Sequence, residues 1–267
     1  MQEQIFEALR RGAHDEALAM AREAVEAEPE SARAHGALAA ALNAAGDREA
    51  ALRAIDQALA LDGGNADLQF RRGLILMALG DADAARDALA RSVEANPNHA
   101  GAYLVQAQLA LGRGDLEEAG RASRLLARVD PGHPWSRVID GMLALARGNV
   151  DEALARLTEA SKLAPDDPQV LLSLALAYIA RGHDAFAEQA LRRLVGERGG
   201  APAWHIMLAE TLLRQRRPEE ALDALRPLLS EDGKATPAVE RLAGEIELVL
   251  GRPEAALQRL RKVLAAE

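Results

Sequence analysis

The sequence predicts an all-α chain in which one helix–turn–helix unit is repeated about eight times. Three observations support this. Apolar residues make up 49% of the 267 residues but aromatic residues only 3%. Such a composition favours closely packed helices over sheets, which prefer aromatic and β-branched residues. Small residues and helix breakers recur at a fixed period, and apolar residues between them fall at helical spacing, as in Ala153, Leu157 and Ala160.

The first recurring position is a glycine that precedes an acidic, alanine-rich stretch. It occurs every 34 residues, at Gly12, Gly46, Gly80, Gly114, Gly148 and Gly182. The next two equivalent positions are Arg216 and, after one inserted residue, Gly251. Because glycine adopts positive φ without strain, this position predicts the turn that ends the first helix of each unit.

Two further positions hold small residues, where the two helices of a unit are expected to meet. One is alanine in every unit, at Ala17, Ala51, Ala85, Ala119, Ala153, Ala187, Ala221 and Ala256. The other is Ala39, Gly73, Ala107, Gly141, Ala175, Ala209 and Gly244. A larger side chain at such a contact would overpack it.

A helix breaker closes each unit and so defines the order of elements. It is Pro29, Gly63, Pro97, Pro131, Pro165, Gly199 or Gly233. The predicted units are 1–31, 32–65, 66–99, 100–133, 134–167, 168–201, 202–236 and 237–267. The first unit opens with a short helix, 2–11. The second helices are expected at 15–28, 49–62, 83–96, 117–130, 151–164, 185–198, 219–230 and 254–266, with a local irregularity over 195–236.

These registers resemble the tetratricopeptide repeat, a 34-residue helix–turn–helix with small residues at positions 8 and 20, glycine near 15 and proline at 32. The resemblance covers essentially the whole chain. It implies one right-handed superhelical solenoid whose first helices line a concave groove, and a non-enzymatic scaffold or adaptor that binds a protein partner. The sequence departs from the family at position 4, where His35 and His205 are expected to be structural histidines with partners inside the chain.

The resemblance places positions 2, 5, 9 and 12 of each first helix in the groove. Arg33 and Asp67 occupy such positions, and the later ones are mostly apolar. The predicted peptide-binding residues are Phe70, Leu74, Met77, Leu104, Gln108, Trp135, Val138, Met142, Leu172, Leu176 and Ile206. They favour an apolar peptide or amphipathic helix, unless they pack against neighbouring first helices instead. The Lys and Asn clamp of chaperone-binding members is absent, which argues against capture of a C-terminal carboxylate.

Three polar residues occupy position 7 in successive units: Arg72, Gln106 and Asp140. Side chains at one position of adjacent repeats are expected to be neighbours. They form either a self-satisfied polar ladder or a set of polar contacts to a ligand.

Charge and motif content exclude several function classes. The net charge of −9 disfavours nucleic acid as a partner. The chain has no cysteine, no histidine pair with HExxH spacing and no phosphate-binding glycine motif, so neither a metal, a cofactor nor catalysis is expected. Acidic pairs such as Asp151–Glu152 are expected to complement helix N-termini. Without an apolar run of 18 residues, no direct membrane insertion is expected. The expected location is cytoplasmic, or periplasmic if a leader was removed.

The last predicted helix, 254–266, carries Leu257, Leu260, Val263 and Leu264, with no further helix predicted to cover them. We therefore expect either a longer natural chain or self-association through this helix. Two other functions remain open. The chain could be the regulatory or substrate-recruiting region of a larger enzyme of the glycosyltransferase or sulfotransferase type. It could also be a bacterial envelope or secretion assembly factor.

Overall fold

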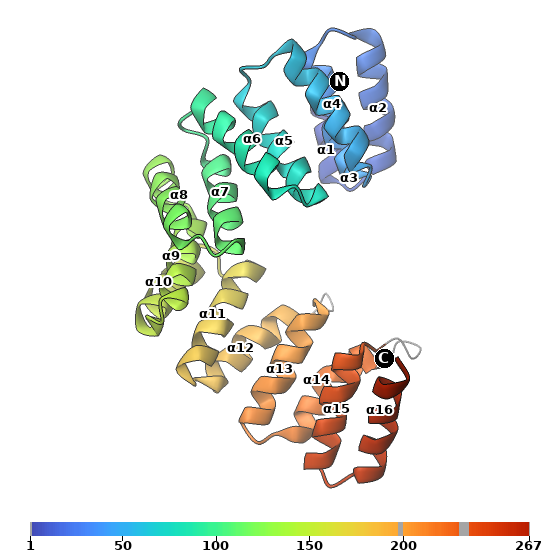
Figure 1. Ribbon diagram of the computed structural model, residues 1–267, viewed down its shortest axis with the longest axis vertical. Helices are drawn as coiled ribbons and strands as arrows, with labels where there is room; N and C mark the ends of the chain where they lie inside the picture. The colour runs from blue at the N-terminus through green and yellow to red at the C-terminus, as the bar shows by residue number, and fades with distance from the viewer. Residues whose placement is uncertain (1, 197–199, 230–234, 267) are drawn as a thin grey trace. The chain divides into compact units, whose positions relative to one another are not determined.

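The computed structural model describes residues 2–196, 200–229 and 235–266. Within these residues, sixteen α-helices follow one another in consecutive pairs (Figure 1). They are α1 (Gln2–Arg10), α2 (His14–Ala27), α3 (Ala32–Ala44), α4 (Arg48–Leu61), α5 (Ala66–Leu79), α6 (Ala82–Ala95), α7 (Ala100–Gly112), α8 (Leu116–Val129), α9 (Pro134–Ala146), α10 (Val150–Leu163), α11 (Pro168–Arg181), α12 (Asp184–Val195), α13 (Pro202–Arg214), α14 (Pro218–Leu229), α15 (Pro237–Val249) and α16 (Pro253–Ala266). The predicted all-α class, with about eight helix pairs, is confirmed.

The chain divides into two compact units, unit 1 (Met1–Ile139) and unit 2 (Asp140–Glu267), with the division inside α9. In unit 1 each helix from α1 to α8 packs against the next, and α3 also contacts α1 and α5. In unit 2 each helix from α10 to α16 likewise packs against the next. A single right-handed superhelix through both units remains a prediction.

The second helix of every pair begins one residue earlier than predicted. The residue after the turn glycine acts as the N-cap, so the helix starts directly behind it. The side chains of Asp47, Asp81 and Asp115 each accept a hydrogen bond from a backbone N–H of the first turn. Acidic residues follow in the first turn as expected, including Asp151 and Glu152 in α10.

The irregularity predicted over 195–236 falls partly outside the described residues, which omit 197–199 and 230–234. The helices that precede these gaps, α12 and α14, have 12 residues each, two fewer than every other second helix. α12 ends at Val195, three residues before the predicted end, and α14 contains Pro227.

The predicted turn positions have left-handed backbone conformation throughout. The glycines from Gly12 to Gly182 at the 34-residue spacing, and Gly251, have φ between 72° and 89°. Arg216, at the seventh position, adopts φ 59° without being a glycine, and it is the one such non-glycine residue among those described. The position in the repeat therefore determines the turn conformation, even where the residue is not a glycine.

The small-residue positions lie where the two helices of a pair pack closely, as predicted. The eight alanines from Ala17 to Ala256 are all fully buried. A Cβ atom added to Gly141 would lie 2.6 Å from Cγ of Leu157, and one added to Gly73 would lie 2.9 Å from Cγ of Leu89. These distances leave no room for a side chain, because the leucine of the paired helix fills the space.

The first three helix breakers that close repeats have their carbonyl groups satisfied by a side chain of the next helix. His35 Nε2 lies 2.8 Å from the carbonyl oxygen of Pro29, and the Tyr103 hydroxyl donates a hydrogen bond to the carbonyl oxygen of Pro97 at 3.1 Å. Between them, the Gln69 amide donates to Gly63 at 3.4 Å. Each pair is six residues apart, and the three pairs follow the 34-residue spacing. His205 is buried, with Nδ1 2.9 Å from the Ala224 carbonyl oxygen, so the structural interpretation of both histidines is confirmed.

Tyr103→Phe is expected to lower the free energy of unfolding by about 0.5–1.5 kcal/mol, because it removes this hydrogen bond while leaving the ring in place. Tyr178→Phe is the matched control, since the Tyr178 hydroxyl has no hydrogen-bond partner among the described residues. Chemical denaturation followed by circular dichroism measures both variants. Equal effects of the two changes would contradict the role given to the Tyr103 hydroxyl.

Candidate functional site

A pocket of about 530 Å³ opens in unit 1 along the first helices of three successive pairs. Its walls come from α1, α3 and α5 and from the segments that precede α3 and α5. The lining residues are Phe6, Ser31, Ala32, Arg33, Gly36, Ala37, Asp62, Asn65, Asp67, Leu68 and Arg71. Apolar and charged side chains therefore share one concave site.

One wall of the pocket is formed by an aromatic ring and a guanidinium group. The Arg71 guanidinium lies over the Phe6 ring, 4.9 Å from its centroid, which is a favourable cation–π distance. This contact joins α5 to the short helix α1. Gly36 also lines the pocket, and its missing side chain leaves room for Leu68, since a Cβ there would lie 2.8 Å from Leu68 Cδ2.

The cationic groups of the pocket have no carboxylate partners. Neither Arg33 nor Arg71 makes a hydrogen bond or ion pair within the part of the chain that the structure describes. The two carboxylates have their own contacts: Asp62 accepts from the Asn65 amide at 2.8 Å, and Asp67 lies 3.2 Å from His99 Nε2. The two guanidinium groups are thus free to bind acceptor groups of a ligand.

His99, which precedes α7, contacts two residues of α5, Asp67 and Phe70. Its Nδ1 accepts the backbone N–H of Ala102 at 3.1 Å, so the ring proton lies on Nε2 and is donated to Asp67. The ring also lies against Phe70, with centroids 4.7 Å apart. Phe70 is therefore held in a defined position beside the pocket.

The residues predicted from the sequence as a peptide-binding groove lie on five different helices. Phe70, Leu74 and Met77 lie on α5, Leu104 and Gln108 on α7, Trp135, Val138 and Met142 on α9, Leu172 and Leu176 on α11, and Ile206 on α13. Leu74 is 37% exposed and Leu176 42% exposed, whereas the others, apart from Val138, are half-buried. The predicted groove residues up to Val138 belong to unit 1, and those from Met142 onward belong to unit 2.

Val138 is a correction to the predicted groove. Its side chain is fully buried, so it belongs to the core and offers no surface to a ligand. The equivalent position holds the longer side chains of Phe70 and Leu104, which stay partly exposed. A short valine at this position is covered by its neighbours.

One expectation for Arg72, Gln106 and Asp140 was a polar ladder in which neighbouring members bind one another. Arg72 instead pairs with a residue outside this set. Arg72 donates from Nε to Asp56 at 2.8 Å, and Asp56 lies on α4, the second helix of the preceding pair. Its charge is therefore satisfied by the helix against which α5 packs. Gln106 is half-buried on α7, and Asp140 belongs to unit 2.

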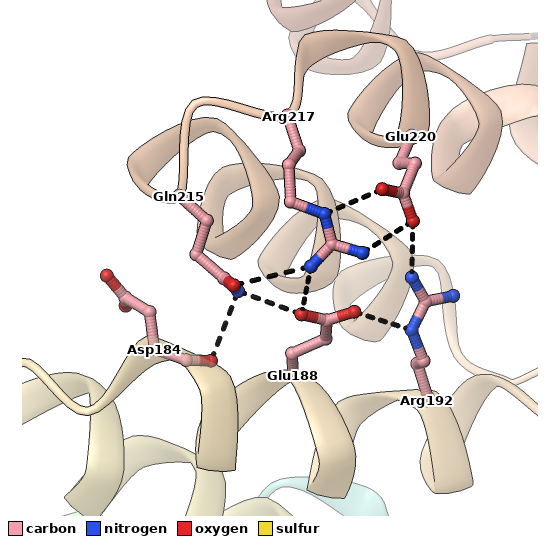
Figure 2. Close-up of polar contacts among 6 residues, drawn as sticks. All are labelled: Asp184, Glu188, Arg192, Gln215, Arg217 and Glu220. Carbon is pink, nitrogen blue, oxygen red and sulfur yellow. Dashed lines mark hydrogen bonds and ion pairs between the residues drawn. The ribbon is translucent and has the colours of Figure 1, made fainter.

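Unit 2 contains an ion-pair network that connects α12 to α14 and the turn before it (Figure 2). Glu188 accepts from Arg217 at 2.6 Å, from Arg192 at 2.8 Å and from the Gln215 amide at 2.9 Å. Glu220 accepts from Arg217 at 2.6 Å and from Arg192 at 3.0 Å. Because two carboxylates face two guanidinium groups, the network is matched internally and acts as a clamp between adjacent repeats.

Burial and hydrogen bonding act in opposite directions on Glu188. Its side chain is 12% exposed, and this desolvation raises the pKa of the carboxyl group. The hydrogen bonds from Arg192, Arg217 and Gln215 outweigh the desolvation, so the net pKa lies below the ordinary value. Glu188 is therefore ionised at neutral pH.

This network and most of the pocket were not predicted from the sequence. Gln215 and Arg217 flank Arg216 in the turn where other repeats have glycine, and this departure was the available signal. Arg33 and Asp67 occupy groove positions and were identified as such. Arg71, one residue beyond a groove position, and Phe6, in the short first helix, had no repeating pattern to single them out.

Neither metal-binding nor membrane-spanning features occur in the described ranges. No group of three or more His, Cys, Asp or Glu side chains there could hold a metal ion. No helix of that part of the chain is long and apolar enough to cross a bilayer.

Comparisons with known proteins point to one repeat family. A family model described as tetratricopeptide repeat matches residues 42–109 and 144–211, and a second model of the same description matches 7–66 and 206–267. No curated protein matches the sequence.

Several solved structures have a similar fold at low sequence identity. A tetratricopeptide repeat protein from Parabacteroides merdae is 17% identical with a TM-score of 0.69, and the match covers 96% of both chains. A chain of the APC/C hetero-tetramer Cut9–Hcn1 is 20% identical with a TM-score of 0.72, and the match covers 99% of this chain and 51% of that one. The type IV pilus biogenesis factor PilW is 18% identical with a TM-score of 0.67, over 75% of this chain and 92% of PilW. At these identities the likeness concerns the fold alone.

Proposed function

Because this chain belongs to the tetratricopeptide repeat family, whose folds generally serve as protein-interaction modules, we propose that it is a non-enzymatic scaffold or adaptor. Its ligand is an amphipathic or apolar segment of a protein partner. In unit 1 the segment binds in the pocket between α1, α3 and α5. The observation that carries the proposal is this pocket, in which Arg33 and Arg71 lack acid partners beside apolar Phe6.

The composition of the pocket supports an amphipathic ligand. Phe6 and Leu68 provide apolar surface, and the two guanidinium groups provide donors for a carboxylate or for backbone carbonyl groups. A ligand that left both arginines without acceptors would bury charge at a cost. A segment with an apolar side chain and a nearby acidic one satisfies both requirements.

The predicted groove residues of unit 1 supply further apolar surface next to the pocket. Phe70, Leu74 and Met77 continue along α5, the helix that also carries Arg71. Methionine can repack around a bound side chain because its thioether chain is flexible. The ligand is proposed to extend along α5 over these residues. The predicted residues of unit 2, Met142, Leu172, Leu176 and Ile206, stay candidates for contacts of their own.

The proposal predicts that Phe6→Ala combined with Arg71→Ala weakens peptide binding by about tenfold or more. The double change removes the aromatic wall and one of the two free donors. Peptides selected from a random library against the natural chain provide the probes, with affinities expected at about micromolar Kd. Fluorescence anisotropy measures their binding to each variant.

Arg53→Ala is the matched control, because Arg53 is an exposed arginine of α4 outside the pocket lining. It should leave peptide affinity unchanged. Thermal unfolding of all variants shows whether the double change acts on the fold. If the selected peptides bound the double variant as tightly as the natural chain, the pocket would not be the binding site.

A second candidate is an assembly factor of the bacterial cell envelope, supported by fold likeness alone. Besides PilW, a Pseudomonas aeruginosa PilF structure matches over 77% of this chain and 99% of PilF, with 18% identity and a TM-score of 0.62. Loss of a surface appendage on deletion of the gene in its native host would favour this role over a general adaptor.

A further inference from the structure

The second helices of the pairs carry a row of equivalent positions, spaced i, i+3 and i+7, which lie on one face of the helix. The row is defined in α8 by Arg121, Arg124 and Arg128, all of which are exposed. The equivalent residues, 34 positions apart, are Ala19, Arg22 and Glu26 in α2, Arg53, Asp56 and Ala60 in α4, Asp87, Ala90 and Glu94 in α6, Ala155, Thr158 and Lys162 in α10, Gln189 and Arg192 in α12, and Asp223 and Arg226 in α14. None of these other rows has more than one basic residue, whereas in α8 every member is arginine.

The charges of the α8 row are largely uncompensated. Arg124 and Arg128 make no hydrogen bond or ion pair within the described ranges of the chain. Arg121 is 3.9 Å from Glu117, and both side chains are mostly exposed, so this pair contributes little. By contrast, Arg192 in the α12 row pairs with Glu188 and Glu220, and Arg226 in the α14 row pairs with Asp223. The α8 row is thus a concentrated cationic stripe on a chain of net charge −9.

The stripe surrounds a shallow depression. Arg121, Arg124, Leu125 and Arg128 line an open hollow of about 370 Å³ on α8. Leu125 is half-buried between the arginines, so the hollow has an apolar floor and a cationic rim. Seven residues of helix separate the outer arginines, which corresponds to about 10 Å along the axis.

We propose that this α8 stripe is a second interaction surface, which binds an acidic segment of a protein partner. Two or three carboxylates spaced over about two turns of a helix match the arginines. An apolar side chain among them contacts Leu125. This surface lies outside the pocket between α1, α3 and α5, and its occupant is chosen by charge complementarity.

Charge distribution favours an acidic protein segment over other polyanions. A nucleic acid carries charge far beyond about 10 Å and requires a wider basic footprint. The same row of the preceding second helix, α6, carries Asp87 and Glu94 instead. An anionic bilayer gains only about 1 kcal/mol per basic residue near its surface, and the net charge of the chain opposes it.

The test uses a fluorescein-labelled, alanine-rich helical peptide with glutamates at i, i+3 and i+7 and one leucine between them. The full chain and the double variant Arg124→Glu/Arg128→Glu are titrated by fluorescence anisotropy at low salt. The double variant is expected to bind about tenfold more weakly or not at all. Binding to the natural chain should weaken as salt is raised, and a glutamine version of the peptide should not bind.

Arg53→Glu/Arg91→Glu is the matched control, since it changes the net charge equally through exposed arginines of α4 and α6. It should bind the peptide almost as well as the natural chain, and Phe6→Ala/Arg71→Ala should do so too. Circular dichroism confirms that each variant is folded. Equal loss in the α8 variant and its charge-matched control would overturn the proposal. So would tighter arginine-dependent binding of single-stranded DNA or phosphatidylserine vesicles than of the peptide.

Discussion

Leu157→Ala is expected to lower the free energy of unfolding of unit 2 by about 2–5 kcal/mol. Leu157 lies on α10, is fully buried and fills the space beside Gly141 of α9. Glycine has no side chain that could move into the cavity left by the truncation. Urea denaturation, with hydrogen exchange of the α10 and α11 amides, measures the loss.

The same contact predicts a coupling between the two positions. Gly141→Ala alone should be destabilising by about 1–3 kcal/mol, because its Cβ would lie 2.6 Å from Leu157 Cγ. In the Leu157→Ala background the clash is gone, and alanine is a better helix former than glycine by about 0.5–1 kcal/mol. The double variant should therefore be more stable than Leu157→Ala alone.

Gly244→Ala is the control for this cycle. A Cβ at Gly244 would lie 3.3 Å from Cγ of Leu260, which is only half-buried and can yield slightly. This change should be close to neutral. Strictly additive effects of the two substitutions in the cycle would contradict the packing described for Gly141 and Leu157.

Glu188→Gln is expected to destabilise unit 2 by about 1–3 kcal/mol at pH 7. The amide keeps the shape of the side chain but removes the charge that faces Arg192 and Arg217. Glu245→Gln, in an exposed ion pair with Arg241 on the surface of α15, is the control and should have little effect. Thermal unfolding across pH measures both variants.

The pH dependence of this difference has a defined sign. The pKa of Glu188 in the folded chain lies below the ordinary value of about 4.5. The stabilisation is therefore complete above that value and is lost as the pH falls through the lower folded pKa. Glu240 acts in the same direction. Desolvation raises the pKa of Glu240, but the hydrogen bonds from Lys262 and Arg259 outweigh this effect, so its net pKa is also lowered. The gap between the natural chain and Glu188→Gln should close below about pH 4.5. A gap that stayed constant from pH 7 to pH 3 would contradict the assignment.

The repeat fold was predictable because its determinants are local and periodic. Steric exclusion at the small residues and positive φ at the turns recur at a single spacing. The start of each second helix was displaced by only one residue. Arg216 shows that the spacing carries information of its own, since an arginine adopts the turn conformation that its position requires.

The site was less predictable because it depends on residues that do not recur. Phe6 and Arg71 meet because α3 packs against both α1 and α5, and so brings these two helices together. Membership of a groove position did not guarantee exposure, as Val138 shows. The uncompensated charge of the α8 row could not be predicted, because the repeat pattern does not show which arginines have acidic partners.

The hydrogen bonds to Pro29, Gly63 and Pro97 come from a histidine, a glutamine and a tyrosine. Three different side chains therefore make the same contact, because each brings a donor group to the equivalent carbonyl oxygen. An alignment column would then look variable although the contact it encodes is constant. A repeat can therefore keep its backbone while the side chain that makes this contact changes.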